Sequence, residues 1–359
     1  NWASGVPMST TDGAGNDVRF SFLTTLMPQA TWMNAHVTTS LTIAPSDRYR
    51  YYMKSGLVWS DVIGMLSYDT DIAFHNVAAD DVNNVEQVRV QYAVVQDSVL
   101  KRLPGRGMKV LAEPDGNKTY LHATEGYAPI QISTAQTSGD GITTVKLKPY
   151  QIGNNDLKDQ TVERWFPNSI ADVENQITTE LAKPKEERSA VFLGVHGTDT
   201  SWVEFWQSLN DTYGKDGDDS MWFPSYEQYY EYNYNRVHAR IDKQVNGNIL
   251  RVTVELPGGQ YFYYPSTTIN LVGLDAEHVQ SITVNDAVTG LSHAAYDSGY
   301  MVNVDCRKGL AARATHFTEL YEKETFTQLR ALYLQDALYF TRMLKDGSTK
   351  SGLLGRLGE

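Results

Sequence analysis

The order of apolar and amphipathic segments constrains this chain more than any other feature of its sequence. Up to about residue 236, short apolar runs alternate with longer segments in which apolar residues recur at helical spacing. The apolar runs predict strands at residues 6–10, 30–34, 71–74, 108–112, 129–133, 191–195 and 220–223. The segments between them predict helices at residues 49–66, 84–103, 170–181, 202–213 and 226–236. This alternation indicates an α/β fold with a parallel sheet, and the number of units favours a (β/α) barrel of about seven or eight strands.

The pattern changes after residue 236. Stretches of β-forming residues, separated by turns rich in glycine, asparagine and proline, predict strands at residues 240–256, 267–274, 279–284 and 300–304. An amphipathic pattern at residues 314–344 then predicts one long or broken helix, and residues 351–355 are expected to form a tail. We therefore expect a barrel at residues 1–237, a small antiparallel β domain at residues 238–305, and a C-terminal helix and tail at residues 306–359.

Charge and hydropathy argue against two classes of protein. The formal net charge of −12, without a basic stripe, disfavours a nucleic-acid groove, because phosphate contacts need clustered Lys and Arg. No apolar run reaches the roughly 18–20 residues that cross a bilayer, so we expect no membrane span. The chain begins at Asn1 without a signal-peptide pattern. We expect a processed or truncated product of a secreted or periplasmic protein.

Cysteine usage limits the kind of metal site that the chain can build. Cys306 is the one cysteine in the sequence, which excludes an internal disulfide and a cluster of thiolate ligands. A bound metal would have to use His, Asp, Glu or water. In a barrel, functional residues of these types gather at the carboxyl ends of the strands.

Asp12 and His75 are both predicted to come directly after a strand. Asp12 precedes a glycine-rich turn, where its carboxylate would either bind a metal or a proton, or cap the turn. His75 follows the run at residues 71–74, where its imidazole would either bind a metal or make a structural hydrogen bond. Asp80 follows His75 closely enough to add a carboxylate ligand.

Two further segments are expected to end at the same edge. The apolar run at residues 191–195 delivers His196, whose imidazole is suited to act as a general acid near neutral pH or to a structural role. The run at residues 108–112 leads into Glu113-Pro114-Asp115-Gly116, which reads most simply as a turn. His122 could point back toward this edge.

Taken in order, these segments resemble the motifs of the polysaccharide deacetylase (NodB-homology) family over about residues 4–236. Ser9-Thr10-Thr11-Asp12-Gly13 is similar to the first motif, Thr-Phe-Asp-Asp-Gly. His75 fits the first histidine of the second motif, and Gly194-Val195-His196 resembles the fifth, Leu-x-His. The resemblance implies a distorted (β/α) barrel that binds a divalent metal, usually zinc, and hydrolyses acetyl groups on glycans. It implies Asp12 and His75 as metal ligands, Asp80 as a substitute ligand, and His196 as the catalytic acid.

Three positions depart from the family pattern. Thr11 stands where the family has its general base, Ala79 where it has the second metal histidine, and Ala112 where it has the arginine that orients the base. Hydrolysis at a metal needs a base for the bound water, stabilisation of the oxyanion and an acid for the leaving group. The loss of a general base alone removes about 10²–10⁴-fold in rate.

The sequence leaves two hypotheses open. The first is a divergent carbohydrate deacetylase with weakened or altered catalytic machinery, which the residues Asp12, His75 and His196 favour. The second is a catalytically inactive barrel that binds carbohydrate or serves a structural role, which the residues Thr11 and Ala112 favour. Under the first hypothesis, and under the carbohydrate-binding form of the second, the expected partner is a glycan or an oligosaccharide.

Overall fold

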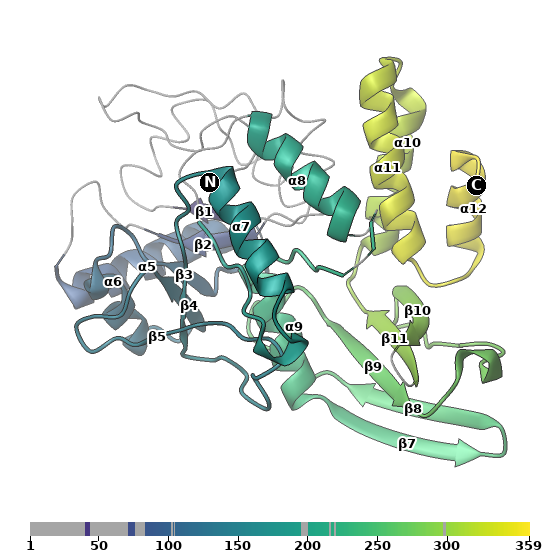
Figure 1. Cartoon of the computed structure of the whole chain (residues 1–359), viewed down its shortest axis with the longest axis horizontal. Coiled ribbons are helices and arrows are strands. Elements are labelled where there is room, and N and C mark those ends of the chain that lie inside the picture. The colour runs from purple at the N-terminus through teal and green to yellow at the C-terminus, as the bar shows by residue number, and fades with distance from the viewer. Residues whose placement is uncertain are drawn as a thin grey trace. The chain divides into compact units, whose positions relative to one another are not determined.

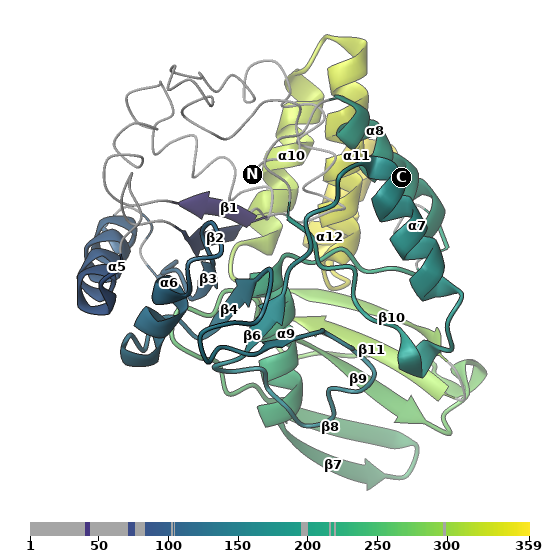
Figure 2. The same cartoon turned by 60° about the vertical axis from the view of Figure 1, so that its left-hand side comes forward.

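The computed structural model describes residues 40–43, 71–75, 83–101, 103, 105–194, 200–214, 217–218, 220–296 and 299–359. The chain divides into two compact units, residues 1–230 and residues 231–359. The division falls inside helix α9 (Tyr226–His238). Figures 1 and 2 trace the elements of both units along the chain. The strands expected at residues 6–10 and 30–34 and the helix expected at residues 49–66 lie outside the described residues.

The first unit is built on a six-stranded sheet in which every neighbouring pair is parallel. Its strands are β1 (Ser40–Ile43), β2 (Asp71–Phe74), β3 (Val110–Ala112), β4 (Ile132–Ala135), β5 (Thr144–Val145) and β6 (Thr161–Glu163). Their order across the sheet is β1-β2-β3-β4-β6-β5, and Figure 2 shows β1, β2, β3, β4 and β6 in succession. β2 and β4 are buried along their whole length, as expected for strands covered on both faces. The prediction of an α/β fold with a parallel sheet is confirmed.

Closure of this sheet into a barrel stays a prediction, because the described strands form an open row with β1 and β5 at its ends. The strand expected at residues 220–223 is wrong, because these residues carry no strand. The strand expected at residues 191–195 is reduced, at its described positions, to a parallel bridge between Leu193 and Trp165, with Trp165 N–H donating to the Phe192 carbonyl (2.9 Å) and Gly194 N–H donating to the Trp165 carbonyl (2.8 Å). The apolar side chains of these segments, including Leu193 and Phe223, instead pack against a cluster formed by two helices. Their apolar character therefore reflects packing against these helices, with sheet pairing limited to the bridge at Leu193.

The helices of the first unit begin where polar side chains cap them. They are α5 (Val85–Leu100), α6 (Lys118–His122), α7 (Ile170–Leu181), α8 (Thr200–Tyr213) and the start of α9, with short 3₁₀ turns at Ala123–Gly126 and Lys185–Glu187. The side chain of Asn84 accepts a hydrogen bond from the N–H of Gln87 at the start of α5 (2.9 Å). Ser169 and Asp172 form a reciprocal capping box at the start of α7. The four helices predicted in this part of the described chain are therefore confirmed.

A buried ion cluster lies at the amino end of the parallel sheet. Arg106 donates to Asp71, the first residue of β2, and to Glu227 on α9 (2.9 Å for the second bond). Lys109, just before β3, also donates to Glu227, and Ser225 donates to Asp71. All five side chains are buried. We call these residues the amino-edge cluster; they tie the first turn of α9 to the ends of two strands.

The second unit contains the antiparallel strands that the sequence predicts. A hairpin of β7 (Arg240–Asn246) and β8 (Ile249–Glu255) stands beside a three-stranded sheet of order β10-β11-β9. The sheet consists of β9 (Ser266–Val272), β10 (Gly290–Tyr296) and β11 (Gly299–Asp305). The strand expected at residues 279–284 is wrong; a 3₁₀ turn at Ala276–His278 precedes this segment, and Val279, Ile282 and Val284 pack against the sheet. β10 was not expected, because its glycine, serine and alanine residues are poor strand formers.

Three helices complete the second unit. They are α10 (Leu310–Lys323), α11 (Thr327–Met343) and α12 (Ser348–Leu357). The long amphipathic segment is thus a broken helix, and the rings of Phe317 and Phe340 stack between its halves with centroids 5.0 Å apart. The expectation of a tail at residues 351–355 is wrong, because Leu353 and Leu357 recur at helical spacing and are both buried. None of the helices in the described part of the chain has the length and apolar character of a bilayer crossing.

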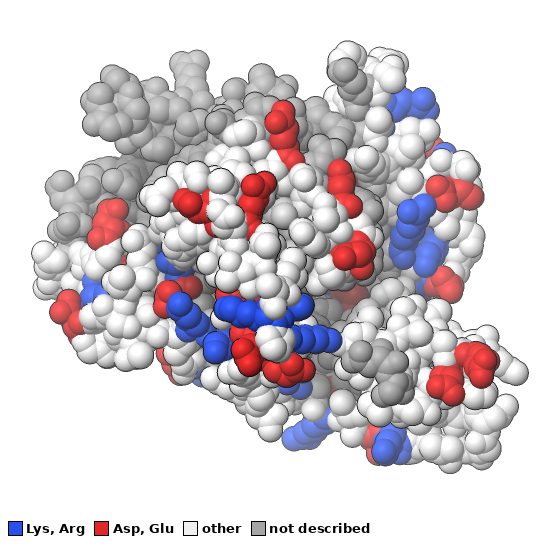
Figure 3. Space-filling view, in the orientation of Figure 1, with Lys and Arg blue, Asp and Glu red and all other residues white. Residues whose placement is uncertain are grey.

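Charged side chains of both signs are mixed on the molecular surface. Figure 3 shows one face of the described residues, on which Lys and Arg lie among Asp and Glu.

Candidate active site

The carboxyl ends of the parallel strands place three chemically useful side chains at one edge of the sheet. His75 comes directly after β2, Glu113 directly after β3 and Arg164 directly after β6. Because the strands are parallel, these positions share the same edge. We call it the carboxyl edge; the amino-edge cluster lies at the opposite ends of the same strands.

His75 is held at this edge by the main chain of the neighbouring strand. Its Nδ1 lies 2.8 Å from the carbonyl oxygen of Ala112, the last residue of β3. A carbonyl can only accept, so Nδ1 carries the proton and Nε2 keeps its lone pair. Burial lowers the pKa of His75 to about 4, against the opposing effect of this hydrogen bond. At neutral pH the side chain is therefore a neutral imidazole with a fixed tautomer.

Arg164 reaches across β4 to the end of β3. Its Nη1 donates to the hydroxyl of Thr134 (3.0 Å), and its Nη2 donates to the carbonyl oxygen of Glu113 (2.9 Å). The guanidinium lies 5.1 Å from the centroid of the Phe166 ring, and the residue is only 9% exposed. Burial lowers the pKa of Arg164 to about 10, which still leaves it charged at neutral pH.

His75 and Arg164 bind consecutive carbonyl groups, those of Ala112 and Glu113. The two side chains therefore reach the end of β3 from opposite sides, His75 from β2 and Arg164 across β4, and the positive charge of Arg164 contributes to lowering the pKa of His75. The carboxylate of Glu113 is engaged separately: it accepts from Lys118 Nζ (2.6 Å) and from the N–H of Gln136 (3.3 Å). This ion pair makes Glu113 a poor candidate for a free general base.

The turn after β3 adds a second carboxylate. Asp115 is exposed and has a positive φ of 48°, followed by Gly116 with a φ of 75°. Its negative charge acts on His75, raising the pKa of that imidazole against the larger effect of burial. His122, by contrast, has both ring nitrogens engaged, with Nε2 2.9 Å from the carbonyl of Asp140 and Nδ1 3.3 Å from Glu125. Asp115 is thus better placed than His122 to act with His75.

Of the four site residues predicted from the sequence, the structure describes one. Asp12, Asp80 and His196 lie outside the described residues, and His75 lies at the end of a strand as expected. The segment that leads to His196 is described up to Gly194, the residue after Leu193, which forms an isolated parallel bridge with Trp165. A Cβ on Gly194 would lie 2.9 Å from the Phe166 ring and 3.0 Å from Cδ of Arg164. This segment therefore packs directly against Arg164.

Arg164 is the residue that the sequence did not suggest. It follows a strand of three residues, Thr161–Glu163, which is too short and too polar to stand out as an apolar run. The available signal was weak: a cation directly before Trp165 and Phe166.

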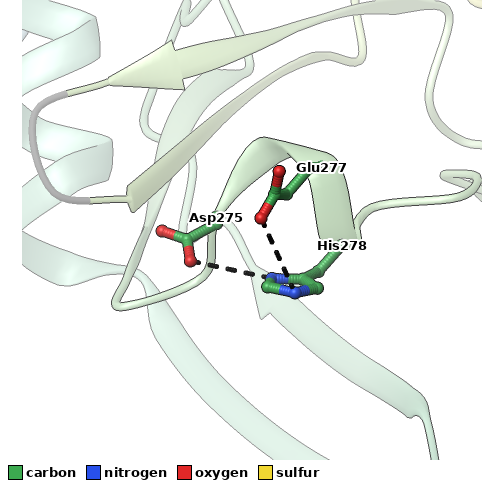
Figure 4. A group of neighbouring side chains, drawn as sticks. All are labelled: Asp275, Glu277 and His278. Atoms are coloured by element: carbon green, nitrogen blue, oxygen red, sulfur yellow. Dashed lines mark ion pairs between the residues drawn. The ribbon is translucent and has the colours of Figure 1, made fainter.

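A different group of possible metal ligands lies on the 3₁₀ turn of the second unit. Figure 4 shows Asp275, Glu277 and His278, with His278 Nδ1 3.7 Å from Asp275 and Nε2 4.0 Å from Glu277. All three are exposed, and their ligand atoms lie within 4.8 Å of one another. Exposed, hydrated side chains from one short turn are typical of a protein surface, so we assign this group no role.

Comparison with known proteins gives one match. The sequence model of a family described as "Putative polysaccharide deacetylase" matches residues 3–358, which is nearly the whole chain. A search of curated proteins finds no match. The matched range includes both ends of the sheet, the antiparallel strands and the C-terminal helices. The chain therefore belongs to this polysaccharide deacetylase family.

Proposed function

We propose that this protein removes acetyl groups from a glycan with the help of a divalent metal ion, zinc being the first candidate. The orientation of His75 carries the proposal. Its Nδ1 donates to the Ala112 carbonyl, which leaves the lone pair of Nε2 available. A histidine that ligates a metal usually donates its other ring N–H to a carbonyl or a carboxylate in this way. The family match supports the glycan as the substrate class.

The residues that would hold the metal are His75, Asp12 and Asp80, with Asp115 as a further carboxylate. These are nitrogen and oxygen ligands, the types that zinc accepts in a catalytic site with a position left for water. A bound divalent ion would lower the pKa of that water and polarise the acetyl carbonyl. His196 is the proposed acid that protonates the leaving group.

The chain's own residues limit how fast this chemistry can be. Position 112 offers only a methyl group as a side chain, and its carbonyl oxygen is used by His75. Glu113 is tied to Lys118. Thr11 has no carboxylate. We therefore propose weakened catalysis, slower by about 10²–10⁴-fold than an enzyme with a dedicated general base.

Metal content and acetate release test the proposal. We expect purified protein, supplied with zinc, cobalt or nickel, to retain about one ion per chain and to release acetate from acetylated chito- or xylo-oligosaccharides. His75→Ala should lose both properties, because it removes the Nε2 ligand. His122→Ala is the matched control, since both nitrogens of His122 are already engaged, and it should keep both properties. Equal metal content in these two variants would refute the assignment of His75.

A second candidate function is carbohydrate binding without catalysis. The methyl side chain of Ala112 at the end of β3 favours it, because that strand end offers no side chain to support a base. Binding of the same oligosaccharides, with no acetate released at any metal concentration, would select this candidate over the first.

A further inference from the structure

The guanidinium of Arg164 has more hydrogen-bond donors than its described partners use. A guanidinium carries five N–H groups. Two of them are used, by the Thr134 hydroxyl and by the Glu113 carbonyl. Nε is buried and has no acceptor among the described residues. An unpaired buried donor of this kind is costly, and one N–H on each of Nη1 and Nη2 is also left without an acceptor among the described residues.

No carboxylate among the described residues accepts a hydrogen bond from Arg164. Its two acceptors there are a neutral hydroxyl and a neutral carbonyl. The negative charge of Glu113 raises the pKa of Arg164 against the larger effect of burial, but the Glu113 carboxylate is paired directly with Lys118 Nζ, at 2.6 Å. Arg106 in the amino-edge cluster is the opposite case, since it pairs with both Asp71 and Glu227. Buried charges are normally paired, so an unpaired cation needs a reason.

The position of Arg164 connects this charge to the candidate active site. Gly194 lies against both the Phe166 ring and the Arg164 side chain, and a Cβ at that position would have to displace one of them. His75 and Arg164 bind consecutive carbonyls at the end of β3. The positive charge of Arg164 acts on His75, so an anion bound at the guanidinium would lie within electrostatic range of the imidazole.

We propose that Arg164 is an anion-binding residue that takes a carboxylate, either the acetate released by deacetylation or the carboxylate of an acidic sugar. Guanidinium and carboxylate are geometrically matched, and bonds between them are among the strongest in proteins. Nη1 and Nη2 each keep one N–H group that would donate to such a ligand. The choice of acetate rests on the proposed function; the binding of a carboxylate does not.

Titration of small carboxylates into the protein tests the proposal without using turnover. Sodium acetate and glucuronic acid are the two probes, N-acetylglucosamine is the uncharged reference, and isothermal titration calorimetry gives the affinities. The titrations use His75→Ala, so that acetate cannot bind at a metal held by that residue. We expect Arg164→Met in this background to weaken binding by about 10–100-fold, as the loss of a charged hydrogen-bonding partner does.

A matched arginine controls for general effects of the substitution. Arg188 also donates to main-chain carbonyls, those of Lys183 and Leu181, at the end of α7. Arg188→Met should leave the affinity for both probes unchanged. Arg164→Lys keeps the charge but loses the planar fork, so we expect an intermediate affinity, and this variant serves if Arg164→Met does not fold.

The outcomes separate the two proposals. Acetate binding that depends on Arg164 supports the product anion, and glucuronate binding that depends on it supports an acidic sugar. Equal affinity in Arg164→Met and Arg188→Met, or no carboxylate binding at all, overturns the proposal. The proposed function fails separately, by absence of bound metal and of acetate release in the wild-type protein.

Discussion

The buried cations at the two ends of the parallel sheet differ in the charge of their hydrogen-bond partners. At the amino edge, Arg106 and Lys109 meet Asp71 and Glu227, so two cations and two anions cancel within one cluster. At the carboxyl edge, Arg164 meets only neutral acceptors among the described residues. Both edges belong to the same strands. The difference therefore reflects the side chains at strand ends and not the architecture.

This contrast separates structural from functional polar residues. The amino-edge cluster pairs cations with anions, although Oε2 of Glu227 has no hydrogen-bond partner among the described residues. Removing one member leaves another buried charge without its counter-ion. A cation with spare donors is complete only when something binds. The amino edge joins the first turn of α9 to the sheet, whereas the carboxyl edge carries the candidate site.

The largest expected effect comes from breaking the balance at the amino edge. Glu227→Gln keeps the size of the side chain but removes the carboxylate that accepts from both Arg106 and Lys109. We expect the free energy of unfolding to fall by about 3–5 kcal/mol, measured by urea denaturation. Asp97→Asn, which removes an exposed ion pair with Lys101, should cost less than about 1 kcal/mol. If Glu227→Gln also lost less than about 1 kcal/mol of unfolding free energy, the proposed difference between the two edges of the sheet would be wrong.

Asp336 on α11 sharpens the comparison, because it is a buried carboxyl group with no acceptor or donor partner among the described residues. Burial raises its pKa well above the ordinary range. In the folded protein the Asp336 carboxyl group therefore keeps its proton, whereas in the unfolded chain it releases the proton above about pH 4. The free energy of unfolding should consequently be highest below about pH 4 and should fall as the pH rises toward the raised pKa. Tyr333, on the same helix, is the titratable neighbour whose pKa is raised, by burial and then by Glu324 and Asp336.

Asp336→Asn should remove this dependence. At pH 7 we expect its free energy of unfolding to exceed that of the wild-type protein by about 1–3 kcal/mol, with the gap narrowing toward pH 4. Chemical denaturation at several pH values measures both. Asp346→Asn, at an exposed residue paired with Lys350, is the control and should show no such trend. A gap that does not change with pH would contradict the prediction.

A smaller effect is expected from crowding Arg164. In Gly194→Ala the new methyl group would meet the Phe166 ring and Cδ of Arg164. We expect a loss of about 1 kcal/mol in unfolding free energy, because the arginine side chain can partly adjust, together with weaker carboxylate binding. Gly139→Ala meets only Cε of Lys118, at 3.4 Å, and should change stability by less than about 0.5 kcal/mol. Unaltered carboxylate binding in Gly194→Ala would separate this segment from the anion site.

The smallest expected effect is the protonation of His75, which should occur without a change in the fold. The imidazole of His75 should titrate with a midpoint of about 4 in an NMR experiment, and His75→Gln identifies its resonance by loss. Because an unfolded histidine takes up its proton near pH 6.5, unfolding binds a proton between about pH 4 and 6.5, and this residue makes stability rise with pH there. A midpoint near 6.5 would mean that the imidazole is hydrated.

The sequence predicts the elements whose signals are local. β2 is found at Asp71–Phe74 and α7 at Ile170–Leu181, as predicted, because a bounded apolar run and a capping box are both visible in the chain itself. β6, with three residues, and β10, with small polar residues, exist because neighbouring strands pair with them. No periodicity within such a strand can reveal a partner that lies elsewhere in the sequence.

The candidate site divides in the same way. The place of His75 after a strand could be predicted, because it needs only the position of β2. The acceptor on Ala112 and the reach of Arg164 across β4 could not, since both depend on which strands are neighbours. The motif comparison identified the arginine side chain that is absent at position 112. It could not identify the main-chain carbonyl of Ala112 as the acceptor for His75.

The hydrogen bond between His75 and Ala112 has a consequence for how this chain can vary over time. Its acceptor belongs to the backbone, so every amino acid at position 112 would supply it. Substitutions there can remove or restore side-chain chemistry while the imidazole keeps its tautomer. What would erase it is a slip in the pairing of β2 with β3, now set by Phe74 opposite Leu111. The orientation of His75 therefore depends on the pairing of the strands and not on the side chain at position 112.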